Sequence, residues 1–187
     1  PPPPARRGPS CRVDPATRAG GYLAGGFRPP SGVLVRPDGG IFIADNQGAW
    51  LPASKLIHVK RGRFYGHRNG TPRQTGTRYP HGGVPSLNSH RPESPPAVWF
   101  PQNESADSPS ESFCMKRGPF AGQILVCALT TGRILHPALE GVDVVLLGAV
   151  FRFTQSLEYG VNPHILAPDA CLCGGSPVAL GSPALCH

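Results

Sequence analysis

The stretch GVLVRPDGGIFIADNQG, residues 32–48, decides the fold that we expect for this chain. Two short apolar runs, residues 33–35 and 41–44, flank the tetrapeptide PDGG. Proline presets φ, aspartate bonds back to the backbone, and glycine adopts positive φ without strain, so the tetrapeptide favours a tight turn. The stretch therefore predicts a β-hairpin.

A polar cluster follows the second strand of this hairpin directly. Scaffolds commonly present ligand-binding groups where a buried strand ends. Carboxylate, amide and indole groups together suit recognition of a sugar or a quinone, which makes Asp45, Asn46, Gln47 and Trp50 the predicted binding residues. An alternative of equal weight is a capped turn in which Asp45 and Asn46 bond the local backbone.

The rest of the chain has short β-rich segments and no convincing helical periodicity. Residues 102–110 are polar and typical of a turn-forming loop. Strands are predicted within residues 54–60, 97–101, 123–129, 133–136, 142–147 and 149–153.

A second copy of the opening pattern lies far along the chain. Residues 165–175 repeat the order of apolar run, Pro-Asp, apolar run and glycine, and Asp169 follows Asp38 by 131 positions. That distance is about three units of the 40-odd residues that form a four-stranded propeller blade. Repeated hairpins without helices favour a β-propeller or part of one.

Composition divides the chain into three parts. Glycine and proline number 24 each and crowd into particular stretches. Residues 1–30 are expected to form a flexible lead-in, residues 31–175 the propeller fragment, and residues 176–187 an irregular tail. Within the fragment, residues 67–96 are almost free of aliphatic side chains and predict a long irregular loop.

Charge and hydropathy narrow the function classes. The chain has 18 basic and 11 acidic residues and a net charge of +7, but the basic residues are scattered, so nucleic-acid binding is not expected. No run of about 18 apolar residues exists, so no transmembrane helix is predicted. The chain begins with proline and no signal peptide is visible, so we expect its true start to lie elsewhere.

No metal site is predicted. Six cysteines would permit disulfides, but buried thiols are the favoured interpretation. The tail residues Cys171, Cys173 and Cys186 miss the spacing of a zinc site. The acidic segment 104–111 has ligand types that suit calcium, yet it lacks EF-hand spacing and favours a solvated loop.

Four segments of this sequence carry a resemblance to a known family, which runs in the same order over residues 32–175. The chain resembles the glucose/sorbosone dehydrogenase-like six-bladed β-propellers, in particular the bacterial membrane-bound dehydrogenase-like or haem-binding-type members. The best-characterised relatives are soluble quinoprotein sugar dehydrogenases. The matching segments are residues 36–48, 54–67, 118–126 and 148–162.

The resemblance implies an all-β chain, a partial six-bladed β-propeller of about three antiparallel four-stranded blades with disordered ends. It implies a fragment of a quinoprotein-like dehydrogenase that oxidises CH–OH groups of a sugar or alcohol. In the full-length protein the cofactors would be pyrroloquinoline quinone and calcium, with a cytochrome c-type electron acceptor. The implied location is periplasmic or extracellular.

The residues after the polar cluster depart from the family pattern. In quinoprotein relatives an Arg-Asn pair follows the Asp-Gln-Gly turn and contacts quinone and substrate, whereas this chain has Ala49 and Trp50. An indole does not replace a guanidinium that neutralises quinone oxygens. No histidine is assigned as a catalytic base, and His58 is expected to be structural. This chain alone is expected to be inactive, and the alternative function is a non-catalytic propeller module that binds carbohydrate or protein partners.

Overall fold

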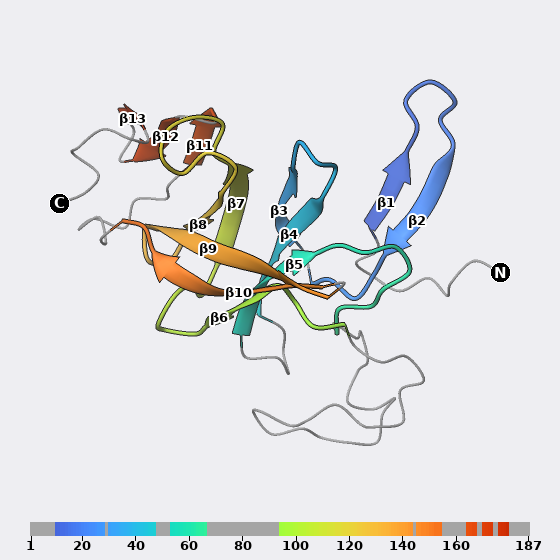
Figure 1. Cartoon of the computed structure of the whole chain (residues 1–187), viewed down its shortest axis with the longest axis horizontal. Helices are drawn as coiled ribbons and strands as arrows, with labels where there is room; N and C mark the ends of the chain where they lie inside the picture. The colour runs from blue at the N-terminus through green and yellow to red at the C-terminus, as the bar shows by residue number, and fades with distance from the viewer. Residues whose placement is uncertain are drawn as a thin grey trace, which may run out of the picture.

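The computed structural model describes residues 10–28, 30–47, 53–66, 94–143 and 145–154 and the strands at 164–167, 170–173 and 176–179. Every regular element in these residues is a β-strand, and every pair of strands is antiparallel (Figure 1). The predicted all-β class is therefore confirmed. Among the described residues, no helix is long and apolar enough to cross a membrane.

Two four-stranded sheets form the centre of the structure. In each sheet the strands follow one another in chain order, the meander expected of a propeller blade. The first sheet contains β3 (Pro30–Val35), β4 (Ile41–Asp45), β5 (Ala53–His58) and β6 (Val98–Pro101). The second contains β7 (Pro109–Cys114), β8 (Ile124–Ala128), β9 (Arg133–Val142) and β10 (Val145–Arg152).

Two smaller sheets flank this pair and lie on opposite sides of it in Figure 1. A hairpin is formed by β1 (Ser10–Val13) and β2 (Gly20–Ala24). A three-stranded meander is formed by β11 (His164–Ala167), β12 (Ala170–Cys173) and β13 (Ser176–Ala179). Successive antiparallel meanders of this kind identify the fold as a partial β-propeller.

The opening hairpin has the turn that its sequence predicts. Gly39 adopts φ +83, its N–H donates to the carbonyl of Arg36 at 2.9 Å, and Arg36 N–H donates to the carbonyl of Gly40 at 2.8 Å. The Asp38 carboxylate accepts the Gly40 N–H at 2.9 Å. This is a three-residue loop with glycine in the left-handed region, which fixes the register of β3 against β4.

The main core lies between the two central sheets. Their first strands, β3 and β7, lie against each other, as do their last strands, β6 and β10. β11 in turn lies against β7, so the first strands of three consecutive sheets are neighbours. Leu34, Phe42, Ala44, Leu56, Ala97, Val98, Phe100, Ala106, Ile124, Val126, Ala128 and Leu135 are the buried residues of this core.

The other face of the first sheet packs against the N-terminal segment. Ile43 and Ile57 on this face are buried with two residues of that segment: Ala24, which ends β2, and Phe27, which follows it. Phe27 also stacks on Tyr65, with ring centroids 5.5 Å apart. Part of the segment expected to be a flexible lead-in therefore contains a hairpin and contributes core residues.

Two further sequence expectations were wrong in detail. Residues 109–110, assigned to a loop, begin β7, whose sequence PSESFC is too polar to resemble a buried strand. Residues 142–147, assigned to one strand, are divided: Val142 ends β9, Asp143 adopts φ 52, and Val145 begins β10.

Several expectations remain predictions. The domain boundaries and the six-bladed ring are not tested, and most of the long loop at 67–96 lies outside the described residues. Cys171 and Cys173 lie in β12, but their side chains are outside the described part of the structure. Cys186 and His187 lie outside the described residues as well. None of the three cysteines whose side chains are described, Cys11, Cys114 and Cys127, forms a disulfide.

The meander also sets where functional groups gather. Because each strand reverses direction, the last residues of β4, β6, β8 and β10 lie at the same end of the two sheets as the start of β3. We call this the polar end, because Asp45, Asn46 and Gln47 lie there. The last residues of β3, β5, β7 and β9 lie at the opposite end.

Gly32 gives a test of the contact between sheets. A Cβ at this position would lie 2.5 Å from the carbonyl oxygen of Ser110 in β7, so Gly32→Ala should push β3 away from β7. We expect the free energy of unfolding to fall by about 1–3 kcal/mol, measured by urea denaturation.

Gly141→Ala is the matched control, because its Cβ would meet only Leu146 Cδ2 at 4.0 Å. This variant should stay within about 1 kcal/mol of the unmodified protein. Equal stability of the two variants would contradict the close approach of β3 and β7.

Candidate functional site

Asn46 joins the two central sheets at the polar end. Its Nδ2 donates to Ser31 Oγ at the start of β3, at 2.7 Å. Its Oδ1 accepts a hydrogen bond from Ser108 Oγ, in the connection to β7, at 3.3 Å. These partners lie 15 and 62 positions away, so Asn46 bridges segments far apart in the sequence.

Ser54 makes a second bridge beside it. Its Oγ accepts the backbone N–H of Gln47 at 3.2 Å and donates to the carbonyl of Asp107 at 3.2 Å. Ser54 is buried, with 1% of its surface exposed. The connection after β4 is therefore fixed to the connection after β6 by the side chains of Asn46, Ser54 and Ser108.

Asp45 and Lys55 form a buried ion pair beneath these connections. They stand directly opposite each other on β4 and β5, and Lys55 Nζ lies 3.6 Å from Asp45 Oδ2. Asp45 is fully buried and Lys55 is 3% exposed. Lys55 Nζ also donates to the carbonyl of Tyr65 at 2.6 Å and lies 5.7 Å from the centroid of the Trp99 ring.

The pair also fixes the chain before β3. The Arg28 N–H donates to Asp45 Oδ2 at 3.4 Å, and the Arg28 guanidinium donates to the carbonyl of Gln47. Arg28 therefore contacts the last residue of β4 and the connection that follows it. One carboxylate links the N-terminal segment, β4 and β5.

Burial changes the acid–base properties of this carboxylate. It raises the pKa of Asp45 from 3.8 to about 6, although the neighbouring Lys55 charge acts in the opposite direction. Asp45 Oδ1 and Gln47 Oε1 are buried, and neither has a hydrogen-bond partner among the described residues. Unpartnered buried oxygens disfavour a charged carboxylate, in agreement with the direction of the shift.

The structure brings three of the four predicted residues together. Asp45, Asn46 and Gln47 lie at the polar end, while Trp50 lies outside the described residues. The alternative was a capped turn with local backbone bonds, but the side-chain hydrogen bonds that the described residues show for Asp45 and Asn46 are to partners at least 15 positions away. A binding role for the four residues remains a prediction.

Sequence reasoning missed the partners of these residues. Arg28, Ser31 and Ser108 carry no local signal, because they meet Asn46 or Asp45 only through folding. Lys55 did have a signal: once the register of β4 against β5 is set, it stands opposite Asp45.

His58 ends β5, and its packing agrees with the structural role expected of it. It stacks on Phe42 with ring centroids 4.7 Å apart and an interplanar angle of 10°. Burial lowers the pKa of His58, which favours the neutral ring in this contact.

The described residues do not by themselves fit a quinone with calcium. A quinone needs cations that face it. Three cations at this end bond protein groups: Arg28 the carbonyl of Gln47, Lys55 the Asp45 carboxylate, and Arg152 Nη2 the carbonyl of Glu104 at 3.2 Å. A fourth, Arg133 at the start of β9, has a buried Nε with no hydrogen-bond partner among the described residues. No group of three or more histidine, cysteine, aspartate or glutamate residues that could hold a metal occurs in the described part of the chain.

Comparisons with known proteins support the fold. No family model and no curated protein matches the chain. An oxidoreductase from Thermus thermophilus, described as a glucose dehydrogenase, superimposes with a TM-score of 0.54 and 19% identity over 80% of this chain and 40% of that one. Another glucose dehydrogenase does so with a TM-score of 0.51 and 20% identity, over 86% and 43%.

The PQQ-bound aldose sugar dehydrogenase from Streptomyces coelicolor superimposes with a TM-score of 0.49 and 16% identity, over 91% of this chain and 41% of that one. The chain thus spans about 40% of the length of the solved structures that it matches. At these identities the similarity to the glucose dehydrogenases shows a shared fold, the β-propeller.

The pKa of Asp45 gives a test of the buried pair. Between about pH 4 and 6 the folded protein keeps a proton that the unfolded chain has released, so the contribution of Asp45 to stability falls as pH rises. Relative to the double variant Asp45→Asn/Lys55→Met, the free energy of unfolding should fall by about 2–3 kcal/mol over this range and then level off.

Urea denaturation of both proteins from about pH 4 to 7.5 measures this difference, and all other carboxylates cancel because the two proteins share them. A difference that grows with pH would mean that the attraction of Lys55 outweighs the burial of Asp45.

Proposed function

We propose that this chain is part of a sugar-oxidising β-propeller of the quinoprotein type, which acts on CH–OH groups. The observation that carries the proposal is the superposition of 80% of the chain on a glucose dehydrogenase with a TM-score of 0.54. The polar end of the central sheets supplies a surface of amide and hydroxyl groups, the chemistry that recognises a sugar.

In this proposal Asn46 is the main sugar contact. It is partly exposed. Its bond to Ser31 uses one hydrogen of the side-chain amide, and its bond from Ser108 uses one lone pair of the amide oxygen. An amide has a second hydrogen and a second lone pair, which suit the adjacent hydroxyls of a sugar ring. Holding the amide from two sides reduces the entropy lost on binding.

The other predicted residues act around it. Asp45 holds Arg28 and Lys55 in place and so positions the connection that bears Asn46 and Gln47. Trp50 would offer an aromatic face to the sugar ring. Pyrroloquinoline quinone would accept the hydride in the complete protein, with calcium and a cytochrome c-type acceptor, in the periplasm or outside the cell.

A second candidate is a propeller module that binds carbohydrate without oxidising it. Engagement of Arg28, Lys55 and Arg152 by protein groups favours this candidate, because these three cations are then not directed at a quinone. Ala49 and Trp50 in place of the Arg-Asn pair favour it further.

Titration of the 187-residue chain with D-glucose, followed by NMR, tests sugar binding at Asn46. We expect shifts in the amide signals of residues 45–47 and 104–108, and a dissociation constant about 3–10-fold higher for Asn46→Ala, since a neutral hydrogen bond contributes about 0.5–1.5 kcal/mol. Gln123→Ala, an exposed amide at the opposite end, is the control and should bind as the unmodified chain does.

Addition of pyrroloquinoline quinone, calcium and an electron-acceptor dye separates the two candidates. Bleaching of the dye that depends on glucose supports the dehydrogenase. Glucose binding with neither bleaching of the dye nor thermal stabilisation of the chain by quinone and calcium supports the non-catalytic module. Absence of both binding and bleaching would contradict sugar recognition by this chain.

A further inference from the structure

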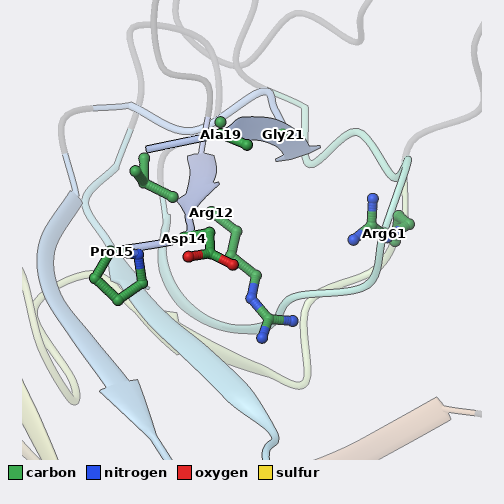
Figure 2. Close-up of a pocket in the computed structure, with 8 residues that line it drawn as sticks. Arg12, Asp14, Pro15, Ala19, Gly21 and Arg61 are labelled. Carbon is green, nitrogen blue, oxygen red and sulfur yellow. The ribbon is translucent and has the colours of Figure 1, made fainter. Parts of the chain in front are cut away.

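A pocket of about 420 Å³ lies between the β1–β2 hairpin and the turn after β5, away from Asn46 (Figure 2). The turn follows β5, so it leaves the first sheet at the end opposite the polar end. Arg12, Asp14, Pro15, Gly20 and Gly21 line the pocket from the hairpin, and Arg61 lines it from the turn.

Backbone hydrogen bonds hold the two sides of the pocket together. Gly62 N–H donates to the carbonyl of Leu23 at 2.6 Å, and Gly25 N–H donates to the carbonyl of Arg63 at 3.1 Å. Tyr65 N–H donates back to Gly25 at 2.9 Å. The segment bearing Arg61 is thereby fixed against the strand that bears the glycines, and the pocket is part of the folded structure.

The segments around the pocket concentrate positive charge. Residues 10–25 and 59–66 together carry five basic side chains and one acidic side chain, whereas basic residues are scattered elsewhere. Arg12 and Arg61 face the pocket from its two sides in Figure 2. Guanidinium groups present several N–H donors in a planar fork, which matches the oxygens of a carboxylate or a phosphate.

Asp14 is the one carboxylate in the pocket, and its position is fixed locally. Its Oδ1 accepts the backbone N–H groups of Ala16 at 2.8 Å and Thr17 at 3.0 Å. These backbone bonds hold the pKa of Asp14 below its usual value, and Arg12 acts in the same direction. Asp14 therefore shapes the turn of the hairpin while it opposes any anion that enters.

We propose that this pocket binds a small oxyanion, the phosphate or carboxylate group of a small-molecule ligand, between the guanidinium groups of Arg12 and Arg61. Gly20 and Gly21 present no side chain, and a Cβ at Gly21 would meet nothing within 4 Å, so a ligand can approach the backbone there. The site is separate from the polar end and does not depend on the proposed sugar oxidation.

Isothermal titration calorimetry of the 187-residue chain tests the site at low ionic strength, with inorganic phosphate in one arm and D-glucuronate in the other. Binding of phosphate alone indicates a phosphate ligand, binding of glucuronate alone indicates a carboxylate ligand, and binding of both indicates a site that accepts either oxyanion. Arg12→Gln and Arg61→Gln should each weaken binding about tenfold, as expected for loss of a charge-assisted hydrogen bond. Arg117→Gln, an exposed arginine in the connection after β7, makes the same charge change and should leave binding unaltered.

Asp14→Asn gives a test in the opposite direction. Asparagine keeps a side-chain oxygen for Ala16 and Thr17 but removes the negative charge, so affinity should rise about threefold to tenfold. This gain cannot come from loss of folding. The proposal is overturned if neither ligand binds, if Arg117→Gln weakens binding as much as Arg61→Gln, or if Asp14→Asn brings no gain.

Discussion

The close approach of β3 and β7 at Gly32 is the constraint on which the rest of the structure depends. Because Gly32 has no side chain, the backbone of β3 meets the backbone of β7 near Ser110 directly. That contact lets the apolar faces of two four-stranded sheets bury Phe42, Leu56 and Leu135 between them. It also brings Asn46 within hydrogen-bond distance of Ser108, so sheet packing and the polar end have one cause.

The polar end is supported from below by ionic and hydroxyl groups that solvent hardly reaches. Lys55 and Asp45 occupy opposing positions on neighbouring strands, and Ser54 fixes the connection above them. Buried ion pairs contribute little net stability. This pair bonds the Arg28 N–H and the carbonyl of Tyr65 and so connects three segments. The end that offers amide and hydroxyl groups is therefore a rigid surface of the sheets, as a binding site requires.

Local signals predicted a large part of this fold. The turn at Gly39 and the strands β4, β5 and β8 were predictable because apolar periodicity and turn chemistry are both encoded within a few residues. β7 was missed because its neighbours in space, and not its own polar sequence, make it a strand. Asp45, Asn46 and Gln47 lie at one end because they are consecutive in the chain, but their partners Arg28 and Ser108 are brought there by long-range packing that no single-sequence pattern records.

The opposed pair of Asp45 and Lys55 has a consequence for how this sequence can diverge. Replacement of either residue alone leaves the other charge buried and unpaired. This lowers the free energy of unfolding by about 3–5 kcal/mol, a large part of the roughly 5–15 kcal/mol that stabilises an ordinary domain. Substitutions at the two positions are therefore coupled: both residues are replaced or both are retained. Among descendants of this sequence, positions 45 and 55 should covary, and that signature would allow the β4–β5 register to be read from an alignment alone.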